Sequence, residues 1–133
     1  MAVFFQFAPN RTCRIQLTGA VSLLELTAVV DVLRHEQPDL SCVLCDAARA
    51  TSVGSTVPDV AKAWLASAGN WFQPGMRIAV VVTPAAEAAA TERLESYGAF
   101  IPATVRVFQS MLDAEVWLFE TLLLEQQGGS PSS

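Results

Sequence analysis

Basic residues and long apolar runs are both scarce in this sequence. Its 133 residues include one lysine, Lys62, and one histidine, His35, and the formal net charge is −5. Nucleic-acid binders neutralise phosphates with clustered Lys and Arg, so this composition argues against that class. Away from the N-terminus the longest uninterrupted apolar run is 78–82, whereas a membrane-spanning helix needs about 20 such residues. No basic residue precedes the apolar N-terminal segment, so we expect no secretory signal and a cytoplasmic location.

Cysteine is also scarce, and its three copies form no evident metal or redox site. Cys42 and Cys45 make a C-x-x-C pair inside an apolar segment that is typical of a buried strand. Side chains three positions apart on a strand point to opposite faces, so these two thiols do not converge on one metal ion. Cys13 makes the count odd. We therefore expect buried free thiols, no metal and no cofactor.

The remaining composition is that of one folded domain. Apolar residues make up 52% and charged residues 16% of the chain, which is enough for a substantial core. Residues 1–125 show no internal repeat and no change in composition, so we predict a single domain there. Residues 126–133 are polar and rich in Gly and Ser, which predicts a flexible tail.

Periodicity and turn residues divide the domain into alternating strands and helices. Apolar patterns predict strands at 3–7, 13–17, 42–46, 77–83 and 104–108. Helices are predicted between these strands and after the last, with starts after the capping residues Ser22, Thr56 and Ser110 and at Pro84. This alternation predicts an α/β fold: a five-stranded, mostly parallel sheet with an antiparallel edge strand at 3–7 and helices on both faces.

Four segments carry a family likeness through their order along the chain. They are Ile-Gln-Leu-Thr-Gly at 15–19, Val-Leu-Cys-Asp at 43–46, Arg-Ile-Ala-Val-Val-Val at 77–82, and Val-Arg-Val-Phe at 105–108 followed by Ala-Glu-Val-Trp-Leu at 114–118. With these segments the chain resembles the STAS-like superfamily, and within it the SpoIIAA-like small bacterial proteins, which are related to STAS and CRAL-TRIO domains. The resemblance implies a small α/β domain, often dimeric, without an established catalytic centre. It also implies kinship with domains that hold lipids or other apolar ligands.

The resemblance further implies a relation to phosphorylated regulators of sigma-factor control, and here the chain departs from the pattern. In those regulators a strand ends in Asp-Ser-Ser-Gly, and a Ser there is phosphorylated by a partner kinase. This chain has Asp-Ala-Ala-Arg at 46–49. Hydroxyl groups follow a few residues later, at Ser52, Ser55 and Thr56. A phosphorylation-linked partner switch through these residues is the alternative function.

The predicted ligand site lies at the carboxyl end of the strand at 42–46, where ligands of parallel sheets usually bind. We expect the loop at 47–56 and the next helix to bound a region for an apolar or amphipathic small molecule or a partner protein. The residues of this region are Asp46, Ser52, Ser55, Thr56, Trp64, Trp71 and Phe72. Each also has a simpler interpretation: Asp46 accepts hydrogen bonds from loop amides, and the aromatic residues are core.

The last predicted helix, 111–126, has more apolar surface than one sheet face covers. Its apolar residues fall in three adjacent rows, so part of this surface stays exposed after docking. A symmetric homodimer through Val116, Phe119 and Leu123 would cover it, and we expect one. Deep burial of the helix within the monomer is the alternative.

No catalytic signature stands out in the sequence. It shows no nucleophile–base pair, no paired carboxylates at a defined spacing, no metal cluster and no Gly-rich phosphate loop. We therefore predict a non-enzymatic binding or regulatory domain whose contact with membranes is at most peripheral.

Overall fold

The computed structural model describes residues 3–9, 11–36, 39–53, 75–97 and 103–128, which form five strands and three helices. Along the chain these are β1 (Val3–Ala8), β2 (Thr12–Val21), α1 (Leu23–Glu36), β3 (Cys42–Val53), β4 (Arg77–Val81), α3 (Pro84–Tyr97), β5 (Thr104–Phe108) and α4 (Met111–Gly128). All the predicted strands are present, and the helix predicted after Thr56 lies outside the described residues.

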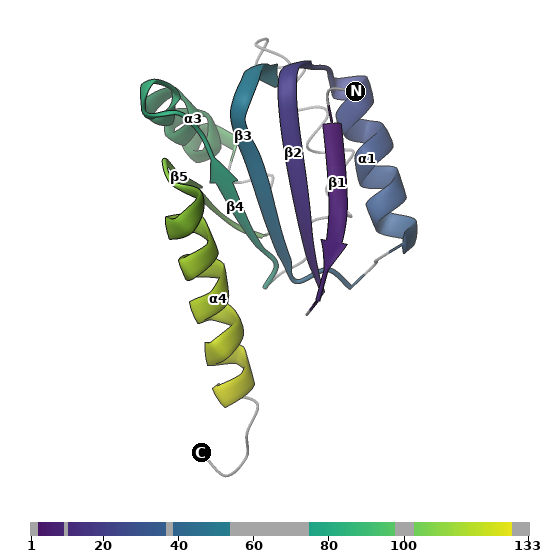
Figure 1. Cartoon of the computed structure of the whole chain (residues 1–133), viewed down its shortest axis with the longest axis vertical. Coiled ribbons are helices and arrows are strands. Elements are labelled where there is room, and N and C mark those ends of the chain that lie inside the picture. Colours follow the sequence, from purple (N-terminus) through teal and green to yellow (C-terminus); the bar gives the residue numbers. More distant parts are fainter. Residues whose placement is uncertain (1–2, 10, 37–38, 54–74, 98–102, 129–133) are drawn as a thin grey trace.

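The strands form one sheet in the order β1-β2-β3-β4-β5, so each strand lies beside its neighbour in the chain. β1 pairs antiparallel with β2, whereas β2, β3, β4 and β5 run parallel to one another (Figure 1). The predicted α/β fold with an antiparallel edge strand is thereby confirmed. A tight turn joins β1 to β2, and Arg11 in this turn has a φ of 55°, in the left-handed region.

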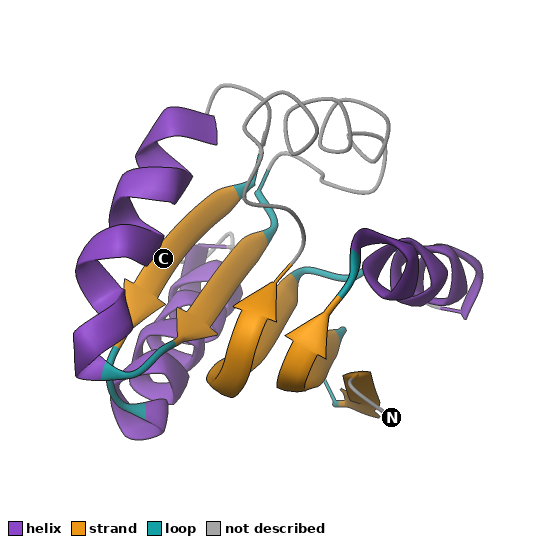
Figure 2. Ribbon diagram, turned by 90° about the horizontal axis from the view of Figure 1, so that it is seen from above, coloured by secondary structure: helices purple, strands orange, loops and turns teal. Residues whose placement is uncertain are grey.

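Helices α1 and α4 cover opposite faces of the sheet, each with its own apolar cluster (Figure 2). On one face, Leu33 of α1 packs with Cys13, Val43 and Ile78. On the other face, Leu118 of α4 packs in a cluster that contains Cys42, Leu44, Ala79, Val81 and Ala114. After Arg77, successive residues of β4 enter different clusters, which explains why 78–81 are all apolar instead of alternating.

β2 and β3 extend further than their sequence pattern predicts. The structure continues β2 to Val21 and β3 to Val53, past the predicted ends. The predicted loop is therefore wrong for residues 47–53, which remain paired with β2. β4 ends opposite Asp46, so beyond this point β3 has a strand partner on one side only among the residues that the structure describes. Pairing on one side permits the small and polar residues that look like a loop in the sequence.

Helices α1 and α4 begin at the capping residues that the sequence indicates. Ser22 Oγ accepts a hydrogen bond from the Glu25 N–H at 3.2 Å, and the Ser22 N–H donates to the Glu25 carboxylate at 3.4 Å. Ser110 Oγ accepts from the Asp113 N–H at 3.4 Å. α4 continues to Gly128, so the first residues predicted as tail belong to the helix.

Candidate functional site

The sheet face under α4 is covered by this helix only in part. Helix α4 packs on β3, β4 and β5. Toward β1, side chains on the same face line open hollows instead, among them Gln6 opposite Arg14 and Phe4 opposite Gln16. The flank of α4 and this face of β1 and β2 therefore bound an open trough, which has a deeper and a shallower part.

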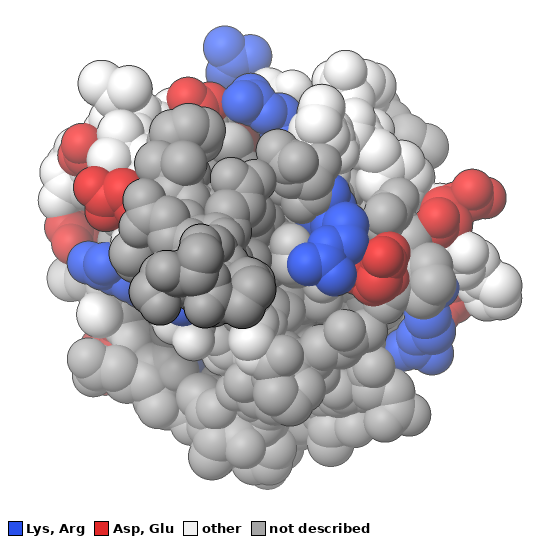
Figure 3. All heavy atoms as spheres, turned by 90° about the horizontal axis from the view of Figure 1, so that it is seen from below, with Lys and Arg blue, Asp and Glu red and all other residues white. Residues whose placement is uncertain are grey.

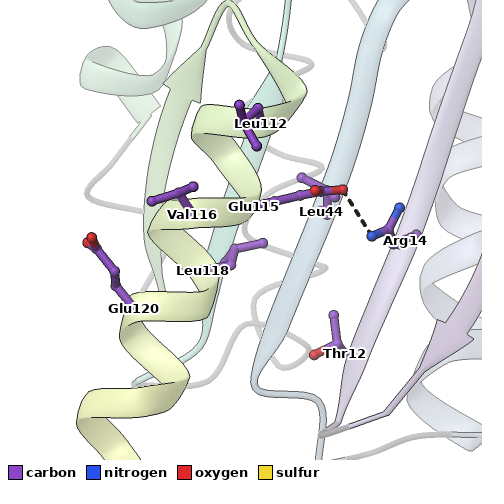
Figure 4. Close-up of a pocket in the computed structure, with 8 residues that line it drawn as sticks. All are labelled: Thr12, Arg14, Leu44, Leu112, Glu115, Val116, Leu118 and Glu120. Atoms are coloured by element: carbon purple, nitrogen blue, oxygen red, sulfur yellow. Dashed lines mark hydrogen bonds and ion pairs between the residues drawn. The ribbon is translucent and has the colours of Figure 1, made fainter.

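The deeper part of the trough lies between α4 and β2 and has a volume of about 560 Å³. Its lining residues are Thr12, Arg14, Leu44, Leu112, Glu115, Val116, Leu118 and Glu120. Figure 4 shows that Glu115 and Leu118 point from α4 toward the strands, whereas Val116 and Glu120 point away from them and mark the outer rim. Leu44 and Leu118 are buried and provide an apolar floor.

The shallower part continues over the β1–β2 hairpin and has a volume of about 220 Å³. Its lining residues are Phe4, Gln6, Arg14, Ile15, Gln16, Leu44, Asp46 and Met111. Arg14 and Leu44 border both parts, so the two parts are adjacent. Phe4 in the shallower part is 62% exposed and Leu112 in the deeper part is 67% exposed. The trough thus has apolar side chains in both parts and polar side chains between them.

Arg14 and Glu115 form an ion pair across the trough. Arg14 Nη2 lies 3.0 Å from Glu115 Oε1, and the two side chains are 56% and 38% exposed. Water screens an exposed pair, so its contribution to stability is about 0–1 kcal/mol. Asp46 and Glu120 add negative charge to the lining. The trough therefore presents both signs of charge beside its apolar floor.

No protein-family model matches the chain, and no curated protein matches it in sequence. Among solved structures, an uncharacterised protein of the DUF3478 family with a SpoIIAA-like fold, from Shewanella loihica PV-4, aligns with a TM-score of 0.58 at 15% identity. This likeness covers 88% of the present chain and 92% of that chain. The protein has a SpoIIAA-like fold.

The resemblance drawn from the sequence is thereby confirmed at the level of the SpoIIAA-like fold. A solved structure of Mglu also aligns, with a TM-score of 0.34 and 14% identity over 83% of this chain and 20% of that chain. At such identities a likeness concerns the backbone architecture. The chemistry of the trough therefore depends on the side chains of this chain.

Within this SpoIIAA-like fold, Asp46 lies inside β3 and not at the predicted end of the strand. Its Oδ1 accepts a hydrogen bond from the Ala48 N–H at 3.1 Å. The pairing of β2 with β3 changes register between Gln16↔Asp46 and Thr18↔Arg49, so this contact lies at a β-bulge. Asp46 thus accepts from a backbone amide, as its simpler interpretation expects, but this amide lies in β3 and not in a loop. Its side chain also borders the shallower part of the trough.

The other predicted ligand residues are not brought into the trough by the part of the chain that the structure describes. Ser52 is exposed in β3, where it pairs with Ala20 of β2. It does not border the trough. The remaining five lie outside the described residues: Ser55, Thr56, Trp64, Trp71 and Phe72. The phosphorylation-linked partner switch therefore stays a prediction.

Helix α4 turns one apolar row toward the sheet and another away from it. Ala114 and Leu118 are 0% and 5% exposed, whereas Leu112 and Val116 are 67% and 47% exposed. The apolar surface expected outside the core is thus present on this helix. Two residues of the predicted dimer interface have side chains outside the described part, Phe119 and Leu123. The homodimer stays a prediction.

Sequence reasoning missed Arg14 and Thr12 as site residues, although their pattern contained a signal. Polar residues alternate with apolar ones along β2, whereas β4 is apolar after Arg77. A strand that helices cover on both faces is apolar on both, so a polar face on β2 indicates that the sheet is open there. The sequence pattern of β2 does not indicate that α4 packs beside this polar face.

None of the three cysteines forms a disulfide bond, and Cys42 and Cys45 lie on opposite faces as expected. Burial raises the pKa of Cys13 to about 11. Burial, reinforced by the Asp46 carboxylate, raises the pKa of Cys45 to about 12. At neutral pH these two thiols are protonated and therefore poor nucleophiles. The described residues contain no group of three or more His, Cys, Asp or Glu side chains that could hold a metal ion.

Acidic and basic side chains are interspersed on the face that Figure 3 shows. Among the described residues on this face, groups of opposite sign lie near one another and no broad basic field is present. A protein that follows a phosphate backbone needs such a field. None of the helices in the described ranges is long and apolar enough to cross a membrane.

Proposed function

We propose that this protein is a non-enzymatic binding domain that holds an amphipathic small molecule in the trough between α4 and the β1–β2 hairpin. The observation that carries the proposal is the combination of a buried apolar floor, large exposed apolar side chains in both parts and a polar centre. The SpoIIAA-like fold supports a regulatory role for such a domain, in which an occupied trough signals the presence of its ligand.

The apolar part of the proposed ligand is indicated by four side chains. Leu44 and Leu118 form the floor, and Phe4 and Leu112 remain largely exposed in the two parts of the trough. A ligand that covers apolar surface gains about 25 cal/mol for each Å² removed from water. An elongated apolar body therefore fits the trough better than a compact polar one.

The polar part of the ligand is indicated by the centre of the trough. Gln6, Gln16 and Arg14 line it, and Arg14 remains 56% exposed despite its ion pair. A guanidinium carries five N–H donors, so Arg14 can bind ligand oxygens as well as Glu115. The deeper part, about 560 Å³, is within the range of about 300–1,000 Å³ that is usual for small-molecule pockets.

Binding is favoured over catalysis by the residue types in the trough. Its described lining residues include no histidine, cysteine or serine. Two of its carboxylates already have partners, because Glu115 pairs with Arg14 and Asp46 accepts from the Ala48 N–H. A catalytic site needs a nucleophile or base that a neighbouring group orients toward substrate. These carboxylates are oriented toward the protein instead.

Calorimetric titration with monolaurin, a neutral amphiphile, tests this function. Phe4→Ser combined with Leu112→Ser removes two exposed apolar contacts without opening the core, and we expect monolaurin affinity to fall about tenfold or more. Leu24→Ser is the matched control, because Leu24 is 81% exposed on α1, outside the trough. It should bind monolaurin as the unaltered protein does.

Native mass spectrometry of protein purified without detergent provides the second readout. We expect a co-purified small molecule, or uptake of monolaurin at one molecule per chain. A bare protein mass together with no saturable monolaurin binding would contradict the proposed function.

A further inference from the structure

Two arginines converge on one tryptophan at the β5 side of α4, away from the trough. The Cζ atom of Arg77 lies 5.9 Å from the centroid of the Trp117 ring, and the Cζ atom of Arg106 lies 5.5 Å from it. Arg106 also lies 5.3 Å from the Phe108 ring, which itself packs against Trp117 at 5.6 Å between centroids. Two cations and two aromatic rings thus form one cluster.

The sheet register fixes this convergence. Arg77 is opposite Thr104, and Arg106 is opposite Ala79, two residues further along β4. Arg77 and Arg106 are therefore diagonal neighbours on the face that α4 covers, a relation that places such residues about 7–8 Å apart. The Trp117 ring extends from α4 and lies close to both arginines.

Neither guanidinium has an anionic partner among the described residues. The Nε of Arg77 is buried without a hydrogen-bond partner. Glu115, an acidic residue of α4, pairs with Arg14 on β2 instead. Two like charges consequently face the same ring, in a protein whose net charge is −5. Their mutual repulsion is relieved when an anion binds between them.

The aromatic contact leaves the donors of both arginines available. A guanidinium that stacks on a ring uses its π face, while its N–H groups lie in its plane and point outward from its edges. Stacking also reduces the number of side-chain conformations that must be lost on binding. Two forked donors held in this way match the oxygens of a phosphate group.

We propose that Arg77 and Arg106, held against Trp117, form a binding site for a phosphate group, either free or in a small phosphate ester. The site lies on the opposite flank of α4 from the trough and is independent of the function proposed for the trough. Trp117 and Phe108 form the apolar wall of this site, and the two guanidiniums supply its charge and donors.

Calorimetric titration with inorganic phosphate and with glycerol 3-phosphate, at constant ionic strength, tests this site. We expect saturable binding of at least one probe, and a loss of affinity of about tenfold or more in Arg106→Gln. Binding of both probes assigns the site to the phosphate group itself, whereas binding of the ester alone assigns it to phosphate esters. Arg106→Lys keeps the positive charge but loses the paired N–H donors of the guanidinium, so its affinity for phosphate should be intermediate.

Arg34→Gln on α1 is the matched control, because it removes one exposed positive charge far from the cluster in sequence and on another element. It should bind phosphate as the unaltered protein does. Arg106 is exposed, so Arg106→Gln should retain the circular dichroism spectrum and allow a valid comparison even where Arg77→Gln does not fold. No saturable binding of either probe, or equal affinity in Arg106→Gln and Arg34→Gln, would overturn the proposal. Phe4→Ser with Leu112→Ser should leave phosphate binding unchanged, which separates this site from the trough.

Discussion

Arg14 on β2 and Glu115 on α4 are separated by 101 positions in the sequence, yet their side chains meet at 3.0 Å. This contact joins the hairpin at the start of the domain to the helix at its end. It crosses the deeper part of the trough, which both residues line. The relative placement of hairpin and helix therefore defines the width of the proposed binding site.

The Arg14–Glu115 pair should contribute little to stability. A double-mutant cycle with Arg14→Ala and Glu115→Ala is expected to give a coupling energy of about 0.2–1 kcal/mol, because both side chains are exposed. The coupling should shrink in high salt, which screens exposed charges. Urea unfolding at low and high salt measures both effects, and a coupling that salt leaves unchanged would contradict the prediction.

Ser22 should stabilise α1 through its cap. Ser22→Ala removes the oxygen that accepts the Glu25 N–H, and we expect a loss of about 1 kcal/mol in the free energy of unfolding. Ser22→Asp is the control, because it keeps an acceptor at the cap and should stay within about 0.5 kcal/mol of the unaltered protein. Equal destabilisation in both variants would argue against capping as the cause.

Ala114 should tolerate no larger side chain. It is 0% exposed, between α4 and the sheet, so Ala114→Leu overpacks this layer and is expected to cost about 1–3 kcal/mol. Leu112→Ala, two residues earlier on the exposed side of the same helix, should change stability by about 0.5 kcal/mol or less. Chemical unfolding of the two variants compares the buried and the outer row of α4 directly.

Stability should fall in alkaline solution through the buried thiols. The folded-state pKa values of Cys13 and Cys45 are about 11 and about 12, above the ordinary value of 9.0. Above the ordinary value the unfolded chain releases protons that the folded chain retains, so each thiol lowers stability by roughly 1.4 kcal/mol per pH unit until its folded pKa is reached. Below the ordinary value this loss is absent.

Cys45→Ala separates the thiol effect from the titration of other groups. Urea unfolding at about pH 8 and at about pH 10 should show a smaller loss of stability in this variant than in the unaltered protein. An identical loss of stability in the two proteins would show that burial does not raise the pKa of Cys45 in the folded state.

The outer row of α4 should mediate self-association. Figure 1 shows that the C-terminal part of α4 extends past the end of the sheet, and Leu112 and Val116 on this helix are exposed. A second copy that packs along α4 would cover this row. Light scattering is expected to give twice the 14.3 kDa of one chain, and Val116→Glu should yield the monomer. Leu24→Glu on α1 should remain dimeric, and a monomeric unaltered protein would end the dimer prediction.

The order of the strands and helices could be predicted because each depends on local signals. Ser22 and Glu25 lie three positions apart, as a cap requires, and β4 is apolar after Arg77 because both of its faces are covered. The end of β3 could not be predicted in this way. Residues 47–53 are small and polar, and their strand conformation depends on hydrogen bonds to β2, a partner distant in the sequence.

The candidate site could be predicted only in part. Asp46 is in the predicted set and borders the trough, although it lies within a strand and not at its end. Arg14 and Gln6 were absent from that set, because an exposed polar residue on a strand is ordinary until a helix docks beside it. Arg77, Arg106 and Trp117 lie on three different elements, and no spacing within one element indicates their convergence.

Hydrophobic periodicity, capping residues and composition alone determined the α/β class, the sheet with its antiparallel edge and the burial of Cys13 and Cys42. Such features depend on interactions between residues close in the chain, or on whether a side chain is apolar. The docking of α4 over β3, β4 and β5 was decided only by the tertiary structure. Packing of distant segments leaves part of that face open, pairs Arg14 with Glu115 and brings two arginines to Trp117. These contacts depend on shape complementarity across the whole chain, which local spacing does not record.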